Sequence, residues 1–205
     1  MELVILDPHL KSALIRRRRR LGLDRFDEVW DGVYVMSPLA DDEHQDIGTS
    51  LASCFVVAVG SMGLGKVRAG SNVSDRVEGW KKNYRCPDVA VYMNGTTAHL
   101  HCTHWVGGPD FAVEGVSRYD RTRQKFNFYA QIGTRELLVV DRYPWALELY
   151  RLNEARAFDL VGRSTVERPD ALASGVLPLS FRLELGEERP RIAVAHADGV
   201  QAWSA

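Results

Sequence analysis

The sequence feature that most limits the fold is Glu136–Val140 (ELLVV), a nearly continuous apolar run. Such runs are found in central strands that are buried on both faces. The run is followed by Ala146–Leu152, which alternates like an antiparallel strand. Residues 120–132, just before the apolar run, read as a helix. Asp120 can cap its start, and Gly133 can lie just past its end. This order predicts a mixed β-sheet with helices packed on it, an α/β (α+β) fold.

The remaining elements are expected to be short. Pro8 precedes a helix at about 9–20, and Phe26–Met36 reads as a hairpin around Asp31-Gly32, because both turn residues tolerate positive φ. An acidic stretch then opens a helix that ends at Gly63 or Gly65 and whose apolar residues recur at helical spacing: Ile47, Leu51, Cys54, Phe55 and Ala58. Further β segments are predicted at Lys66–Val73, Tyr84–Tyr92, Asp110–Ser117, Phe158–Val161, Val176–Leu179 and Ile192–Val194.

Composition narrows the class of protein. A chain of 205 residues favours one domain, 1–205. No apolar run approaches the roughly 18 residues of a membrane span, the start does not resemble a signal peptide, and three cysteines cannot all pair. These features predict a cytoplasmic protein. The net charge of −1 argues against nucleic-acid binding by bulk charge alone, but not against an enzyme with a local basic patch.

Two clusters leave their roles open. The run Arg16–Arg20 is either a solvated helix or arm, or a surface that contacts phosphate. The segment His99–His104 (HLHCTH) has ligands dense enough for zinc, but the four closing ligands of a structural site usually come from two elements.

Two acidic residues are candidates for chemistry because they interrupt apolar strands. Asp88 follows Pro87 in one strand and Glu114 lies in another, and a carboxylate in a half-buried strand is costly unless it is paired. Two carboxylates on neighbouring strands can share Mg²⁺, which takes one or two carboxylates plus water and phosphate oxygens. On the following helix, Lys125 shares a face with Arg121 and Tyr129, at spacing i, i+4, i+8. A lysine beside a metal can orient water and stabilise phosphate charge.

Purely structural roles compete with this interpretation. Asp88 can cap a turn after Pro87, and Glu114 can be the ion-pair partner of Arg121 or Lys125. A lone lysine is more often a surface residue than a catalytic one. The combination of the three residues, in this order, favours the functional interpretation.

The chain also resembles a known family. Three stretches look like the Uma-type putative restriction endonuclease family of the PD-(D/E)XK nuclease superfamily. In chain order they are EVWDGVYVMSPLADDEH, YRCPDVAVY and GPDFAVEGVSRYDRTRQKFNFYAQIGTRELLVVDRYPWALELYRL. The resemblance runs from about Glu28 to Leu152. It implies a restriction-endonuclease-like mixed sheet flanked by helices, with a core at about 26–152, an extra N-terminal hairpin and a C-terminal β extension at 153–205.

The resemblance also implies roles for site residues. Asp88 matches the motif Asp after Pro, Glu114 matches the acid of the next core strand, and the backbone carbonyl of Gly115 completes the metal shell. The superfamily usually has Lys two residues after that acid, where this chain has Val116. Lys125, on the following helix, is the position that matches instead. Glu28 and His44 match the N-terminal signature and are expected to be an accessory ligand or a contact that supports the ligands.

The expected function is therefore a metal-dependent endonuclease that cleaves a DNA phosphodiester with water activated by Mg²⁺ or Mn²⁺. The alternative is a catalytically weak nuclease fold that serves as a binding or regulatory module in a mobile-element or defence context. The near-neutral charge favours the alternative, and the set Asp88, Glu114 and Lys125 favours the enzyme. Nucleic acid is the expected partner, and a homodimer is the simplest arrangement for cutting both strands of a duplex.

Overall fold

A computed structural model describes residues 7–37, 40–116 and 121–205. Its centre is a six-stranded mixed sheet with the order β12-β11-β10-β9-β6-β3. Only the pair β9–β10 is parallel, and the other neighbours are antiparallel. The strands are β3 (Gly65–Ala69), β6 (Val89–Met93), β9 (Phe111–Val116), β10 (Glu136–Arg142), β11 (Trp145–Leu152) and β12 (Phe158–Ser164). The predicted central strand is confirmed as β10, whose Leu137–Val140 are buried between β9 and β11.

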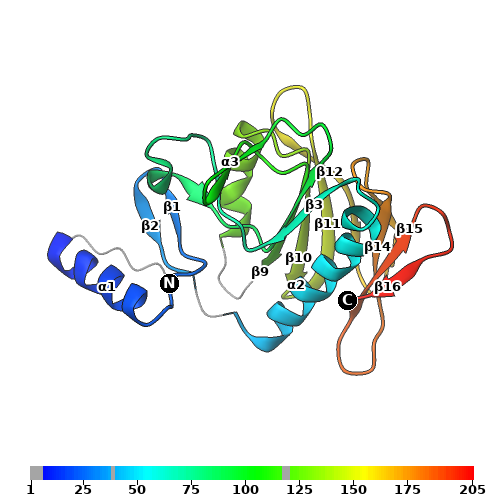
Figure 1. The fold of residues 1–205 in the computed structure, drawn as a ribbon. Helices are drawn as coiled ribbons and strands as arrows, with labels where there is room; N and C mark the ends of the chain where they lie inside the picture. Colours follow the sequence, from blue (N-terminus) through cyan, green and yellow to red (C-terminus); the bar gives the residue numbers. More distant parts are fainter. Residues whose placement is uncertain (1–6, 38–39, 117–120) are drawn as a thin grey trace.

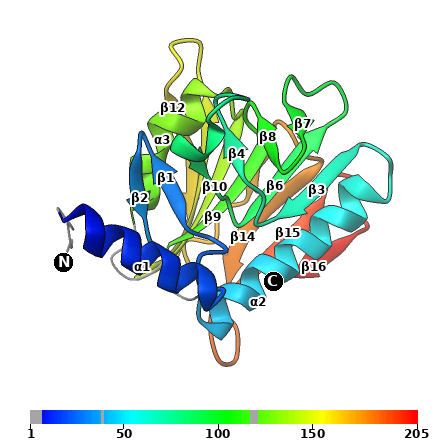
Figure 2. The same cartoon turned by 60° about the vertical axis from the view of Figure 1, so that its left-hand side comes forward.

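Two smaller sheets flank this one (Figures 1 and 2). The first has the order β2-β1-β5-β4-β8-β7 and the second β13-β14-β15-β16. The strands of the first are β1 (Glu28–Trp30), β2 (Val33–Val35), β4 (Val73–Ser74), β5 (Tyr84–Arg85), β7 (His99–His101) and β8 (His104–Val106). The strands of the second are β13 (Leu172–Ala173), β14 (Leu179–Glu184), β15 (Arg191–His196) and β16 (Ala202–Ser204).

The described helices are α1 (Pro8–Arg20), α2 (Asp42–Phe55) and α3 (Phe126–Gln131), with a π-helical turn η1 (Val56–Gly60) after α2 and 3-10 turns η2 (Trp80–Lys82) and η3 (Thr122–Lys125). Helices α2 and α3 pack on opposite faces of the central sheet, whereas α1 lies beside the β1–β2 hairpin (Figures 1 and 2). Strand alternation separates two apolar clusters. Val113 packs with α2 and with β14 and β15, whereas Ala112 packs with α3 and Trp105. The prediction of a mixed sheet flanked by helices is confirmed, and the domain boundaries stay a prediction.

The Asp31-Gly32 hairpin is confirmed. Asp31 has φ 48° and Gly32 φ 86°, which is the left-handed backbone that a two-residue β-turn requires. The His99–His104 segment forms the hairpin β7–β8, with His101 opposite His104. The His104 ring stacks on Trp80 with 4.4 Å between the ring centroids.

Several predicted boundaries are wrong. The segment Lys66–Val73 divides into β3 and β4, in different sheets, because the chain turns at Gly70 with φ 58°. Tyr84–Tyr92 divides into β5 and β6 at Pro87, so Asp88 lies just before a strand and not inside one. The segment Val176–Leu179 is a strand only from Leu179 onward.

The predicted helices also differ in detail from the observed ones. The helix at 120–132 is the turn η3 followed by the short α3, and its expected cap Asp120 lies outside the described residues. The helix α2 ends at Phe55, before Gly63, and continues as η1 to Gly60. No described helix combines the length and the apolar character that crossing a membrane requires.

Candidate active site

Asp88 and Glu114 lie side by side where β6 begins beside β9. The antiparallel register pairs Val89 with Val113, so the next position along places Asp88 opposite Glu114. The Asp88 backbone N–H donates to the Val113 carbonyl over 3.1 Å, which holds the loop in this register. The predicted juxtaposition of the two acids on neighbouring chain segments is therefore present, with Asp88 at the end of the strand.

Glu114 is buried and already has two hydrogen-bond donors. Its side chain is 3% exposed. The Lys125 ammonium lies 2.8 Å from Oε2, and the Tyr129 hydroxyl donates to Oε1 over 2.5 Å. Both donors come from the continuous segment η3–α3, which follows β9 and packs over this face of the sheet. Lys125 and Tyr129 thus meet at Glu114, as their shared face predicted, whereas half-buried Arg121 precedes η3.

Lys125 also contacts a second buried carboxylate. Its Nζ lies 3.0 Å from Glu28 Oε1, and the Lys125 side chain is only 12% exposed. Glu28 accepts the backbone N–H of Cys86 on Oε1 and the indole N–H of Trp30 on Oε2, at 2.8 and 2.6 Å. The β1–β2 hairpin therefore delivers Glu28 to the site and holds it there. Glu28, which the sequence predicted to be an accessory residue, contacts Lys125 in the structure.

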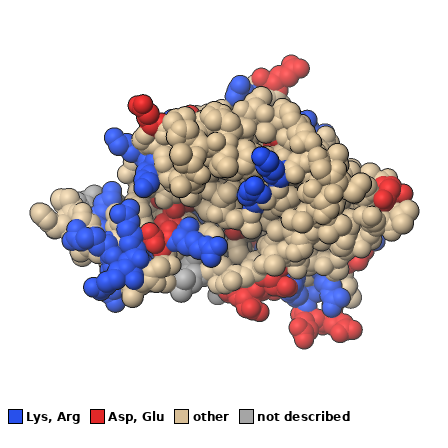
Figure 3. Space-filling model, viewed as in Figure 1, with Lys and Arg blue, Asp and Glu red and all other residues tan. Residues whose placement is uncertain are grey.

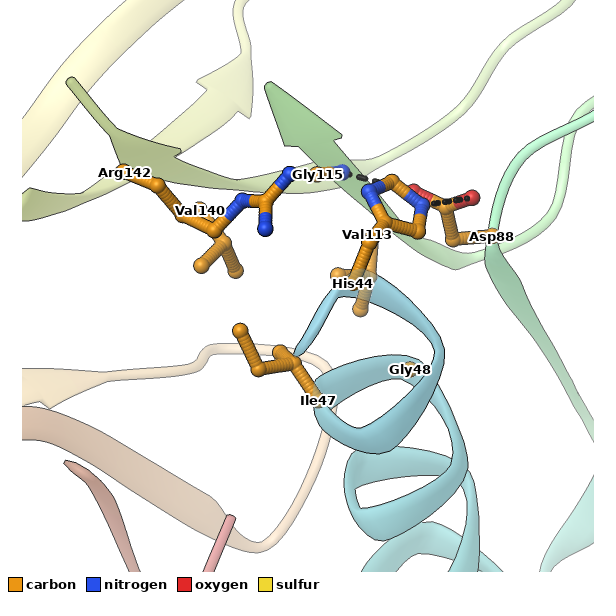
Figure 4. Close-up of a pocket in the computed structure, with 8 residues that line it drawn as sticks. All are labelled: His44, Ile47, Gly48, Asp88, Val113, Gly115, Val140 and Arg142. Atoms are coloured by element: carbon orange, nitrogen blue, oxygen red, sulfur yellow. Dashed lines mark hydrogen bonds and ion pairs between the residues drawn. The ribbon is translucent and has the colours of Figure 1, made fainter. Parts of the chain in front are cut away.

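His44 and Gly115 surround Asp88 from the other side (Figure 4). His44 Nε2 lies 3.0 Å from Asp88 Oδ1, and the Gly115 backbone N–H donates to Asp88 Oδ2 over 2.7 Å. A Cβ at position 115 would stand 2.9 Å from His44 Cε1 and 3.2 Å from Asp88 Oδ2. Glycine at 115 therefore permits the close approach of the histidine and the carboxylate.

These surroundings separate the acidities of the two carboxyls. Burial, opposed by Lys125 and reinforced by the charges of Asp88 and Glu28, raises the pKa of Glu114 to about 8. Burial acts the same way on Asp88 and is the largest single influence there, but the hydrogen bond and charge of His44, the Gly115 N–H and the charge of Lys125 together outweigh it, so the pKa of Asp88 is lowered. The same contact with Asp88 raises the pKa of His44. The site thus pairs one strongly acidic carboxyl with one weakly acidic carboxyl.

The two acids open onto a pocket of about 490 Å³, which is also lined by Glu28, Gly115 and Lys125. The Asp88 side chain, 28% exposed, is the more accessible of the two. Beside it lies a cavity of about 10 Å³, close to the volume that one water needs, among His44, Val140, Arg142 and their neighbours (Figure 4).

Arg142 is a site residue that sequence reasoning missed. Its side chain is 3% exposed, and it contacts Asp41 and Glu43 over 2.8 and 2.7 Å. These contacts hold the first turn of α2, and with it His44, against the end of β10. The available signal was an arginine two residues after the apolar run Leu137–Val140, but its partners lie about a hundred positions earlier in the chain.

The carboxylate oxygens of this site are ligands that suit a hard divalent cation. Within residues 7–37, 40–116 and 121–205, no three His, Cys, Asp or Glu side chains gather into a group able to hold a metal ion. Mg²⁺ needs only one or two carboxylates, with water and phosphate oxygens completing its shell. Asp88 and Glu114 supply those carboxylates at one pocket, and each carboxylate oxygen has more than one lone pair to offer.

Known proteins resemble this chain in sequence and in fold. The family model described as Uma2, "Putative restriction endonuclease", matches residues 23–186. No curated protein matches the chain. Four chains of solved structures match, among them the crystal structure of a putative nuclease belonging to DUF820 from Anabaena variabilis ATCC 29413. That match has 15% sequence identity and a TM-score of 0.56, and it covers 72% of this chain and 80% of the other. It confirms the nuclease-like fold expected from the sequence.

Proposed function

The chain belongs to the Uma2 family of putative restriction endonucleases, and from this premise we propose that it is a metal-dependent endonuclease that hydrolyses phosphodiester bonds in DNA. The observation that carries the proposal is the meeting of Asp88, Glu114 and Lys125 at one pocket, from three separate segments of the chain. A purely structural ion pair between Glu114 and Lys125 would not require Asp88 to face the same opening.

In this proposal Asp88, Glu114 and the Gly115 backbone carbonyl would hold Mg²⁺ or Mn²⁺. When bound, the cation supplies charge neutralisation at the phosphodiester and lowers the pKa of water. His44 fixes the Asp88 carboxylate from one side. Lys125, anchored between two carboxylates, supplies an ammonium that can donate to a phosphate oxygen and balance the charge that develops there.

Tyr129 has a positioning role in this arrangement. Burial and the nearby charge of Glu114 raise the pKa of Tyr129 well above its ordinary value, so the hydroxyl stays protonated and keeps donating to Glu114. This contact fixes the Glu114 carboxylate on the side away from Lys125. Arg121 stands just before the same turn as Lys125, and it is the next candidate for contacting phosphate.

A second function is favoured by one specific observation. Both oxygens of Glu114 already accept hydrogen bonds, one from Lys125 and one from Tyr129. A site closed in this way also suits a nuclease fold that binds or regulates without cutting. Because a ligand that binds only the folded state raises Tm, a titration with Mg²⁺ or Mn²⁺ separates the two functions. An unchanged Tm favours the binding module.

The direct test is cleavage of supercoiled, linear and single-stranded DNA in Mg²⁺ and in Mn²⁺. We expect the wild type to cut at least one of these, and Asp88→Asn to lose cutting, because an amide is a much weaker cation ligand than a carboxylate. Asp170→Asn, on an exposed loop carboxylate, is the matched control and should cut like the wild type. Equal cutting by the wild type and Asp88→Asn would rule out this active site.

Two further parts of the proposal concern assembly and location. Two copies related by a two-fold axis would present two sites to the two strands of a duplex, and sedimentation of the full chain with and without duplex tests this. Cytoplasmic location stays a prediction, which fractionation of the source cells can test.

A further inference from the structure

The N-terminal segment has a charge opposite in sign to the rest of the protein. Residues 8–26 contain seven Lys or Arg and one Asp, whereas the whole chain has a net charge of −1. In Figure 3 the basic side chains gather over α1, at the left end of the molecule. Helix α1 precedes residue 23, where the family match begins, so this surface is an addition to the matched part of the chain.

Helix geometry divides the five consecutive arginines into one inner and four outer residues. At about 100° per residue, Arg17 and Arg19 lie about 100° to either side of Arg18. Arg16 and Arg20 lie about 160° from Arg18, on the far side of the helix. The exposures agree, since Arg18 is half-buried and the other four are exposed. Arg19 approaches Asp24 only at 3.7 Å, with both side chains partly in solvent.

Arg18 fixes α1 to the body of the protein. It donates to both carboxylate oxygens of Asp27 over 2.6 Å, and also to the carbonyls of Leu23 and Ser37. Asp27 is 1% exposed and accepts further bonds from the Tyr34 hydroxyl and the Ser37 backbone N–H. A bidentate arginine–carboxylate pair with this support holds the helix in one orientation.

This anchor connects α1 directly to the candidate active site. Asp27 is followed in the chain by Glu28, which contacts Lys125. The segment that leaves α1 also lines the same 490 Å³ pocket as Asp88, through Gly22, Leu23 and Arg25. The outer arginines therefore stand on a rigid support whose continuation forms one wall of that pocket.

We propose that the four outer arginines of α1 bind the phosphate backbone of the DNA duplex whose scissile bond enters the pocket. The inference rests on the proposed function and assigns it a substrate-holding surface. Guanidinium groups match phosphate geometry and keep their charge. Residues 16–20 span about 6 Å of helix at ~1.5 Å per residue, and duplex DNA carries about one charge per 1.7 Å. The surface thus suits two to four phosphates. It also explains how a near-neutral protein holds nucleic acid.

The test is binding of a fluorescein-labelled 30-base-pair duplex, followed by anisotropy in EDTA over a series of NaCl concentrations. The variant carries Arg16, Arg17, Arg19 and Arg20 all changed to Gln and keeps Arg18. The matched control carries the same charge change on Arg163, Arg168, Arg182 and Arg191, which are exposed on or near the C-terminal strands. Circular dichroism checks that both variants retain the helix and sheet content of the wild type.

We expect the α1 variant to bind at least about 10-fold more weakly at 50 mM NaCl. The slope of log K against log[NaCl] should become shallower by about 2 to 3.5, at ~0.9 for each phosphate that the variant no longer neutralises. The control should change affinity by less than about 2-fold. Unchanged binding by the α1 variant, or equal weakening by the control, would overturn the inference.

Two further outcomes identify which proposal fails. Anionic lipid headgroups also carry phosphate, so the wild type is sedimented with phosphatidylserine vesicles. Vesicle binding that needs the outer arginines, together with duplex binding that does not, overturns the inference. Loss of duplex binding by the α1 variant, combined with a wild type that cuts no DNA, contradicts the endonuclease proposal alone. Cutting by the wild type with unchanged binding by the variant contradicts the α1 inference alone.

Discussion

Replacing Lys125 by Met tests the site assignment that departs most from the superfamily pattern. Methionine keeps an unbranched stem of similar length and removes the ammonium. In the wild type that ammonium lies 2.8 Å from Glu114 and 3.0 Å from Glu28, whose side chains are each 3% exposed. Glu28 would keep its two remaining donors, from Cys86 and Trp30, and Glu114 would keep the Tyr129 hydroxyl.

The structure sets the expected size of the effect. Removing one partner of a buried ion pair typically costs about 3–5 kcal/mol, because it leaves an uncompensated charge. Burial already raises the pKa of Glu114 to about 8, so this carboxyl can take up a proton and lose its charge. We therefore expect the lower end, about 3 kcal/mol near pH 8–9. For a chain of this length that lowers Tm by roughly 6–12 °C, and the variant still folds.

The pH dependence of the effect has a definite sign. The pKa of Glu114 in the folded state is raised above its value in the unfolded chain. The stability that this group contributes is therefore fully present below about pH 4.5 and is lost as the pH rises through the folded-state pKa. Without Lys125 the folded pKa rises further, and the loss continues to a higher pH than in the wild type. The deficit of the variant should therefore be larger at pH 9 than at pH 6, where the absence of the ion pair with Glu28 still contributes.

Calorimetric Tm at pH 6 and pH 9 measures the stability, and DNA cleavage in Mn²⁺ measures the function. We expect cleavage to fall by about 10²–10³-fold, the usual effect of removing one group that stabilises transition-state charge. Lys66→Met, on an exposed lysine of β3, should change neither property. Full cleavage by Lys125→Met would refute its catalytic assignment. A Tm within about 1 °C of the wild type at both pH values would refute the buried-pair argument.

Three other predictions concern neighbouring residues of the site. Asp88→Asn should lower the pKa of His44 toward its ordinary value, because the hydrogen bond and the charge of Asp88 raise it, and an NMR titration of the imidazole protons measures this. Arg142→Met should destabilise by roughly 2–4 kcal/mol at pH 7 in urea unfolding, since the guanidinium is 3% exposed and supports the start of α2. The hydrogen bond from Arg142 lowers the pKa of Asp41, so this pair's contribution is present above about pH 3.8 and lost as pH falls below it. The loss of unfolding free energy in Arg142→Met should accordingly be smaller at pH 3 than at pH 7.

Local chemistry explains which parts of the fold the sequence predicts well. The Asp31-Gly32 turn depends only on two residues that adopt positive φ, so it is correctly placed. The alternation in Phe111–Val116 likewise follows from side chains pointing to opposite faces of a strand. Both signals are contained within a few neighbouring residues, and distant parts of the chain do not alter them.

Strand partners depend on distant contacts, and the predicted strand Lys66–Val73 is wrong for this reason. Lys66–Val73 reads as one strand, but the chain leaves the central sheet at Gly70 and enters another at Val73. Gly70 turns the chain with φ 58°, and the Phe26 ring packs so closely on it that a Cβ at Gly70 would lie 2.6 Å from the ring. Position 26 is more than forty residues earlier, and no periodicity within the segment indicates that contact.

In the site and its surroundings, too, some residues are predictable from local sequence and others depend on distant partners. Asp88 and Glu114 are visible in the sequence because a carboxylate in an apolar segment needs a partner. Arg18 and Asp27 are not, because a long arginine run looks uniform and nothing local marks Arg18 as its one inner member. The helical angle of each arginine separates them only once Asp27 is known to lie beneath the helix.

The location of Lys125 outside the strand has a geometric explanation. Side chains two residues apart in a strand share a face, so a lysine at position 116 would lie on the same face as Glu114. Val116 occupies that place and packs against the apolar cluster around Phe128, where an ammonium would lose its hydration. The turn η3 brings an ammonium to Glu114 from above the same face, with Glu28 as its second carboxylate. A half-buried apolar contact at Val116 and a charged contact at Glu114 can therefore coexist on one face of the sheet, because the apolar side chain comes from the strand and the ammonium from η3.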